Sequence, residues 1–243
     1  MAPGAMLTDK RRGIMRWAHN RGRLTLLALT AGIALAASAP SIASGQGTRL
    51  TRQRVETILA EKRSFFRVDM HGLNLSGLDF REVDLTEANL RGANLTGARF
   101  DNAILVKANL SEAQLSGATF SGTQLDGANF ARVSAGRIDL SGVRMRNAIL
   151  HGADLQGAKL EGADLLGASI ISTNLRRANL ARTLLDEARL IRTDLRETNL
   201  TGASLRRARI VGVDIAGADV RGAIVVGAEI DERGNLDSAA EPR

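Results

Sequence analysis

The stretch ANLRGANLTGARFDNAILVKANLSEAQLSGATF, residues 88–120, carries a large apolar residue at every fifth position. These positions are Leu90, Leu95, Phe100, Leu105, Leu110, Leu115 and Phe120. An α-helix brings side chains back to one face after roughly 3.6 residues and a β-strand after two, so neither element explains a period of five. The stretch therefore predicts a repeating structure of another kind.

The same period continues far beyond this stretch. The multiples of five from Met70 to Ile230 are 33 positions, and 32 of them are Leu, Phe, Ile, Met or Val, the exception being Ala135. Two residues before them Ala occurs 20 times, the residue in between is usually Asn or Asp, and Gly closes 17 of the units. No insertion or deletion breaks the frame over residues 68–232, so the pattern is not a product of chance in a chain that is 44% hydrophobic.

A unit of five residues fits one short straight side followed by a corner. The small and the large apolar side chain would point inward and the other three outward, and glycine suits the corner because it tolerates backbone angles that other residues avoid. Such sides must close into coils, and the coils must stack, because one unit buries little surface alone. Phe80, Phe100 and Phe120 recur every twenty residues, which favours four sides per coil and an aromatic stack along one face.

Runs such as ANLRG-ANLTG, ADLQG-AKLEG-ADLLG and TDLRE-TNLTG resemble the pentapeptide-repeat proteins, whose motif is A(D/N)Lxx. The resemblance covers about two thirds of the chain. It implies an all-β solenoid, a right-handed quadrilateral β-helix with the Leu and Ala side chains inside. The repeats would make about eight coils, roughly 40 Å long at a strand spacing of about 4.8 Å. Ala135 would leave a void in this core, and we expect the larger Val133 and Ile138 to compensate for it.

Residues 1–43 are predicted to be a secretory signal peptide. Basic residues precede an apolar run at residues 24–37 and small residues follow it, which is the order of regions in such a peptide. The run is too short to span a bilayer comfortably, and small residues at Ser41 and Ala43 favour cleavage after Ala43. We therefore expect a periplasmic or secreted protein with no stable membrane anchor after cleavage, or a protein of the thylakoid lumen if the source is photosynthetic.

The segments on either side of the repeats have their own predicted roles. Residues 44–67 are expected to form a linker and a capping helix, because RLTRQRVETILAEKRSFF, residues 49–66, has a helical apolar stripe. The stripe consists of Val55, Ile58, Leu59 and Lys62, with Phe65 and Phe66 at its end. A cap is needed because the first coil of a β-helix has an open apolar floor and unpaired strand edges. Residues 233–243 are expected to be a flexible tail.

The formal net charge of +7 comes mostly from the predicted signal peptide. From residue 45 on, the chain has 27 basic and 25 acidic residues, and residues 68–232 hold 19 basic and 21 acidic ones. No run of Lys and Arg with interleaved aromatic residues occurs, and Trp17 lies in the leader. We therefore expect no nucleic-acid partner.

Few residues suggest catalysis or metal binding. The absence of Cys excludes a thiolate nucleophile and a Cys-type zinc site. His71 and His151 occupy equivalent positions four coils apart, roughly 19 Å at strand spacing, which is too far for a shared metal ion. Asp194 and Asp214 would stack about 5 Å apart, like the carboxylates of retaining glycosidases, but nothing nearby forms a pocket that would raise one pKa. We expect no catalytic residue, no cofactor and no metal.

Three functions from different classes remain. The first, which we favour, is an exported non-catalytic scaffold whose rod surface binds another protein. The second is a DNA-mimicking inhibitor of topoisomerase, an activity known for some members of the family that the repeats resemble. That activity favours a strongly acidic rod, a dimer and a cytoplasmic location, and the near-neutral repeats and the export signal argue against it. The third and least favoured is an envelope hydrolase that uses the stacked carboxylates.

Apolar residues at outward positions gather in two columns and form the predicted partner-binding patch. Ile171, Ile191 and Val211 follow the core residue in three successive coils of one column. On the preceding face the patch would include Leu184, Ile224 and Val226, with Leu166 below them. An apolar surface of this kind predicts contact with an unknown protein or with a second copy of the chain. The alternative is a surface ladder that reflects strand propensity alone.

Overall fold

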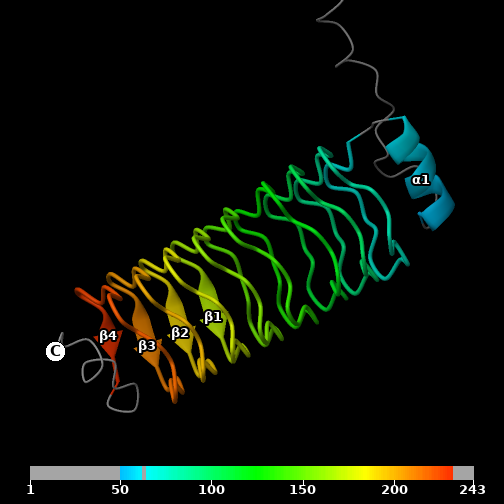
Figure 1. The fold of residues 1–243 in the computed structure, drawn as a ribbon. Helices are drawn as coiled ribbons and strands as arrows, with labels where there is room; N and C mark the ends of the chain where they lie inside the picture. Colours follow the sequence, from blue (N-terminus) through cyan, green and yellow to red (C-terminus); the bar gives the residue numbers. More distant parts are fainter. Residues whose placement is uncertain (1–49, 62–63, 232–243) are drawn as a thin grey trace, which may run out of the picture. The chain divides into compact units, whose positions relative to one another are not determined.

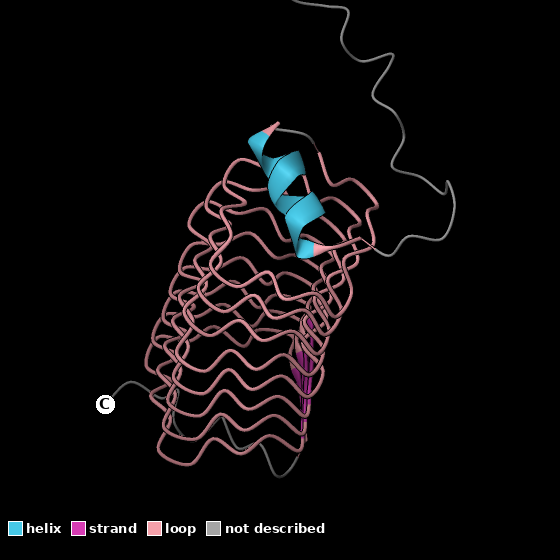
Figure 2. Cartoon of the chain, turned by 90° about the vertical axis from the view of Figure 1, so that its right-hand side faces the viewer, coloured by secondary structure: helices cyan, strands magenta, loops and turns pink. Residues whose placement is uncertain are grey.

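A computed structural model of the chain describes residues 50–61 and 64–231, which form one helix and a coil with four sides (Figures 1 and 2). The helix α1 spans Arg52–Ala60. One parallel sheet, in the order β1-β2-β3-β4, consists of β1 (Ser169–Ile171), β2 (Arg189–Ile191), β3 (Arg209–Val211) and β4 (Glu229–Ile230). The predicted signal peptide and tail lie outside the described residues. No helix within the described ranges has the length and apolarity needed to cross a membrane.

Successive coils pair with a constant offset of twenty residues. In the sheet, Ile170 lies opposite Leu190 and Leu190 opposite Ile210. On the other faces isolated parallel bridges keep the same offset, from Asp69 opposite Asn89 to Ser204 opposite Ile224. Each coil therefore holds four units of five residues, and the four-sided β-helix that the sequence predicts is confirmed.

The central apolar side chains fill the inside of the coil. Phe80, Phe100 and Phe120 are buried and stack along one column, with ring centroids 5.2 and 5.0 Å apart. Ala135 is buried together with Val133 and Ile138, the two residues expected to compensate for its small size. The aromatic column and the inward direction of both apolar positions are thus as predicted.

Every fifth residue from 67 to 227 forms a corner with a positive φ. Glycine holds 17 of these corners, and the other 16 carry residues such as Arg137 (φ 59°) and Arg192 (φ 52°). Side chains with a Cβ disfavour this left-handed region, so the fold imposes it at positions where the sequence alone would not predict it. The stacked hydrogen bonds on both sides of each corner supply that constraint, since the corner N–H bonds to a carbonyl of the next coil, as Arg137 N does to Gln156 O at 2.8 Å.

The helix α1 lies at the N-terminal end of the coil and is shorter than the stretch 49–66 predicted to be helical (Figure 1). The Thr51 hydroxyl caps its start by accepting from Arg54 N, and Val55 and Ile58 are buried against the coil. Arg52 Nη1 ties the helix to the first coil by donating to the carbonyls of Asn74 and Ser76, at 3.1 Å each.

The sequence pattern placed Phe65 and Phe66 at the end of the helical stripe, but both residues lie beyond the end of α1. Phe65 belongs to the first coil, because its N–H donates to Asp84 O at 2.8 Å. Its ring packs edge-to-face with that of Phe80, with the two centroids 5.9 Å apart. Phe66 points outward, with 48% of its surface exposed. The five-residue period therefore begins one unit earlier than Met70, and Lys62 of the predicted stripe lies outside the described residues.

The last described coil is open. Ile215, Val225 and Ile230 are only partly buried, whereas the residues one coil before them, Leu195, Leu205 and Ile210, are fully buried. In the described part of the chain no second helix covers this end. Near this end of the coil, Gly212 N donates to the Asp231 carboxylate at 2.9 Å.

Candidate interaction face

The three residues at the centre of the predicted patch form one ladder. Ile171 lies opposite Ile191 and Ile191 opposite Val211, each at the end of its strand. All three are half-buried, and their neighbours Ile170, Leu190 and Ile210 point into the core. We call Ile171, Ile191 and Val211 the apolar ladder.

The backbone at the apolar ladder differs from that of the other described corners. Elsewhere the residue after a corner donates its N–H to the preceding core residue, as Ala178 N does to Leu175 O at 2.9 Å. Among the described repeats this turn hydrogen bond is missing only after β1, β2 and β3, at Thr173, Thr193 and Val213. The chain stays extended through the apolar ladder instead, which is why strands form on this face alone.

A local pattern in the sequence accounts for this difference. The three units carry a β-branched residue on both sides of the corner, as in Ile171 with Thr173 and Ile191 with Thr193, and no other described unit does. β-Branched residues favour extended backbone over turns. The Thr193 hydroxyl also donates to Ile170 O at 2.8 Å, as the Thr183 hydroxyl does to Leu160 O at an ordinary turn.

Three exposed arginines flank the apolar ladder, and two of them are unpaired within the described residues. Along each strand, Arg189 and Arg209 precede the ladder by two residues and Arg192 follows it by one. Neither the Arg189 nor the Arg192 guanidinium has an ion pair or hydrogen bond within the described residues, and Arg209 has only a contact of 3.7 Å with Glu229. The coil therefore presents an apolar stripe between exposed cations, a feature that the sequence analysis missed.

The other predicted patch residues lie on the preceding face and do not form a second ladder. Leu184 and Val226 are exposed by 43% and 71%, while Leu166 and Ile224 are half-buried. Ser204 lies between Leu184 and Ile224 in the bridged column and donates to the Asp186 carboxylate at 2.6 Å. These apolar residues are thus separated by polar groups, and the apolar ladder is the continuous part of the patch.

The two histidines have ordinary surface partners. His71 Nδ1 lies 2.8 Å from an Asp69 oxygen, and His151 Nε2 lies 2.8 Å from the Ser169 hydroxyl. Within the described ranges, no group of three or more His, Cys, Asp or Glu residues is placed to hold a metal ion. Neither histidine belongs to an arrangement of the kind that a metal site requires.

Asp194 and Asp214 bracket one guanidinium. Arg196 Nη2 donates to Asp194 at 2.6 Å, and Arg196 Nε is 3.5 Å from Asp214. The hydrogen bond from Arg196 holds the pKa of Asp194 below its usual value, against the opposing effect of partial burial. A glycosidase acid needs a raised pKa, so this carboxylate does not suit the general-acid role.

The structure gives these carboxylates a role in the corners. In 17 units, the Asp or Asn before the core residue accepts a hydrogen bond from the N–H two residues further on, as Asp194 does from Arg196 N at 3.0 Å. Where Thr119, Arg144 or Ser204 stands instead, the equivalent N–H bonds to an aspartate of the preceding coil, namely Asp101, Asp126 or Asp186. The polar column is explained by backbone hydrogen bonding.

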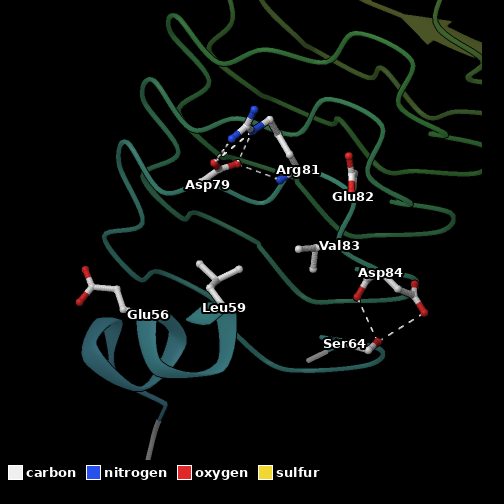
Figure 3. A pocket seen from close by; sticks show the side chains of 8 residues that line it. All are labelled: Glu56, Leu59, Ser64, Asp79, Arg81, Glu82, Val83 and Asp84. Atoms are coloured by element: carbon white, nitrogen blue, oxygen red, sulfur yellow. Dashed lines mark hydrogen bonds and ion pairs between the residues drawn. The ribbon is translucent and has the colours of Figure 1, made fainter. Parts of the chain in front are cut away.

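A hollow of about 690 Å³ lies between α1 and the first coils (Figure 3). Two of its acidic residues are paired: Arg81 binds Asp79 at 2.6 Å, and Arg52 binds Glu56 at 2.8 Å. Arg81 lowers the pKa of Asp79 to about 2. The hollow is lined by Glu56, Leu59, Ser64, Asp79, Arg81, Glu82, Val83 and Asp84. Ser64 lies beside Asp84 in this hollow, but its hydroxyl donates to the Asp84 carbonyl at 3.2 Å as well as to the carboxylate at 3.4 Å, and among the described residues no His lines the hollow to act as a base.

Acidic side chains do not dominate the rod. Ion pairs between successive coils, such as Arg67–Glu87, Lys159–Asp139 and Arg177–Glu197, interleave the two signs of charge along its faces. A mimic of the DNA backbone needs a nearly continuous negative surface, because DNA carries one charge per roughly 1.7 Å of its axis. This charge distribution does not favour the DNA-mimic alternative.

Comparison with known proteins identifies the repeats. The family described as Pentapeptide repeats matches in 8 copies, in overlapping segments that run from residue 64 to residue 225. A search of curated proteins finds no significant match.

Several solved structures are similar to the chain. A trypsin-treated variant of QnrB1, a plasmid-mediated fluoroquinolone resistance protein, is 18% identical, with a TM-score of 0.52 over 70% of this chain and 90% of that chain. HetL, involved in heterocyst differentiation regulation in the cyanobacterium Nostoc, is 26% identical, with a TM-score of 0.30 over 76% and 99%. A protein of the Arabidopsis thaliana thylakoid lumen is 29% identical, with a TM-score of 0.18 over 41% and 63%.

At this identity the QnrB1 likeness bears on the fold alone, and it agrees with the parallel pairing and the offset of twenty residues. With family repeats matched over most of the described coil, the chain belongs to the pentapeptide repeat family and has its right-handed quadrilateral β-helix.

Proposed function

We propose that the protein is an exported, non-catalytic scaffold that binds another protein through the side of its rod. The observation that carries this proposal is the apolar ladder with its unpaired flanking arginines. Half-buried aliphatic side chains in three successive coils leave an apolar stripe in water, and a partner would remove that stripe from solvent. The remaining outward groups are mostly hydrogen-bonded to the corners or paired with opposite charges.

The non-catalytic part of the proposal rests on the chemistry of the candidate sites. The stacked carboxylates share an arginine, and the rings of His71 and His151 lie against Asp69 and Ser169. The hollow beside α1 is open, and Glu56 and Asp79 in its lining are paired with arginines. None of these arrangements combines a nucleophile, a positioned base and a sheltered volume, which hydrolytic catalysis requires.

Export is proposed from the order of basic, apolar and small residues in residues 1–43. Mass spectrometry of the protein isolated from its native source should find Ser44 or a close neighbour at the N-terminus. An intact leader on a cytoplasmic protein would contradict the export proposal.

Protein binding can be tested with a photoreactive amino acid placed at Ser172, an exposed corner beside the apolar ladder. The matched control places it at Gln156, an exposed position on the next face. In the native envelope, we expect a discrete crosslinked protein, or a second copy of the chain, from Ser172 and not from Gln156. No crosslink from either position, or the same products from both, would refute a specific partner on this face.

A further inference from the structure

We infer that the apolar ladder is a docking surface for an amphipathic α-helix with acidic flanks, lying along the rod axis. The inference rests on the proposed function and adds the shape and charge of the partner. It follows from the spacing of the rungs, from the backbone pairing of the strands and from the charges on either side.

The rungs of the apolar ladder match the repeat of a helix. Parallel strands in successive coils lie about 4.8 Å apart, and an α-helix advances about 5.4 Å per turn. Over the two steps from Ile171 to Val211 the two repeats differ by only about 1.2 Å, which side chains can absorb. Apolar residues at positions i, i+4 and i+7 of a helix parallel to the rod axis would each meet one rung.

A strand is a poorer occupant of this face. The backbone groups of β1, β2 and β3 are used in pairing with the coils on either side. The face therefore offers side chains and no free edge, so a partner strand could not extend the sheet here. A helix needs no backbone hydrogen bonds from its partner and can pack on side chains alone.

The flanking cations select the charge of the helix. Arg189 and Arg209 lie on one side of the apolar ladder and Arg192 on the other. Arg189 and Arg192 have no acidic partner in the described residues, because the residues one coil away are Ser169 and Arg209 for Arg189, and Ser172 and Gly212 for Arg192. A helix with Glu or Asp on both sides of its apolar stripe would pair with them by charge-assisted hydrogen bonds. Glu229, at the next coil, sets the limit of the cationic part.

The inference can be tested with two helical peptides of about 18 residues, each with one stripe of Leu. The first peptide carries Glu on both flanks of the stripe and the second carries Lys. Binding of each labelled peptide to the exported protein is measured by fluorescence anisotropy. We expect the Glu peptide to bind and the Lys peptide to bind at least about tenfold more weakly.

Variants locate the binding site. Arg192→Glu and Ile191→Ser should each weaken binding of the Glu peptide about tenfold, and Arg192→Glu should strengthen binding of the Lys peptide. The matched control is Arg137→Glu, which changes an exposed, unpaired arginine at an equivalent left-handed corner of the next face and should have no effect. Circular dichroism checks that each variant keeps its fold.

Failure of this inference can be told apart from failure of the proposed function. If neither peptide binds, if both bind equally, or if Arg137→Glu acts like Arg192→Glu, the acidic helix is wrong. Binding of anionic phosphatidylglycerol vesicles that depends on Arg189 and Arg192, without peptide binding, would also overturn it in favour of a membrane surface. A specific protein crosslink from Ser172 in the same circumstances would leave the scaffold function standing, whereas its absence would reject that function itself.

Discussion

Replacing a left-handed arginine corner with glycine should stabilise the rod. Arg137 has a φ of 59°, and its side chain has no hydrogen bond or ion pair within the described residues. A residue with a Cβ in this region is less stable than glycine by about 1–2 kcal/mol. Glycine also gives the unfolded chain more freedom, which offsets about 0.4–1 kcal/mol of that gain. We therefore expect Arg137→Gly to raise the free energy of unfolding by up to about 1.6 kcal/mol, with a central value of about 0.8 kcal/mol.

Arg137→Ala is the control, because it removes the same side chain and keeps the Cβ. Its stability should equal that of the wild type within about 0.5 kcal/mol. Both variants are compared by urea unfolding followed by circular dichroism, with the m-value checked because long repeat arrays can unfold in more than one step. A glycine variant that is less stable than the alanine variant would show that the corner is not strained, and the reasoning would be wrong.

Three further perturbations test the core, the altered corners and the ion pairs. Leu155→Asp should cost several kcal/mol in thermal unfolding because it buries an unpaired carboxylate, whereas exposed Gln156→Asp should cost little; equal costs would contradict the assigned inward and outward positions. Thr193→Val should cost about 1 kcal/mol, because it removes a buried hydroxyl that donates to Ile170 O; an unchanged free energy of unfolding in urea would count against this contribution. The pKa of Asp79 is lowered from 3.8 to about 2, so its stabilisation is present above pH 3.8 and is lost as the pH falls through 2. As the pH falls from 3.8 to about 2, the melting temperature of Asp79→Asn should therefore decrease less than that of the wild type. Equal decreases in the two proteins would contradict the pairing of Asp79 with Arg81.

The period of five predicted stacked coils, because it links sequence directly to geometry. Phe80, Phe100 and Phe120 favoured four units per coil and the resemblance to pentapeptide-repeat proteins implied the same number, so every outward residue had an expected neighbour twenty positions away. That is why Ile171 and Ile191 could be placed in one ladder before any coordinates were known. The limit of the helix could not be found in this way. Phe65 fits both the helical stripe and the five-residue period, and its bond to Asp84 O decides between them.

Other features were within reach of the sequence and were missed because outward residues were considered one at a time. Many ion pairs join residues twenty positions apart, as in Arg67–Glu87 and Arg177–Glu197. The same offset gives Arg192 only Ser172 and Gly212 as neighbours, so its lack of a partner can be read from the sequence. The corners that lack the turn hydrogen bond have a comparable signal, a β-branched residue on both sides. Local propensity alone does not reveal it, because Val106 is β-branched and keeps the ordinary turn.

The coincidence of these two features on one face supports a functional reading of the rod. Extended backbone and stacked Ile side chains could arise from strand propensity, which acts within each coil. Strand propensity does not place cations, and although Arg137 is unpaired as well within the described residues, Arg189 and Arg192 are unpaired there on either side of an apolar stripe. Unpaired cations around an apolar stripe leave charge and area available to a second molecule. The apolar ladder and its flanking arginines are therefore the part of the coil that stacking alone does not account for, and the crosslinking and peptide experiments test this part.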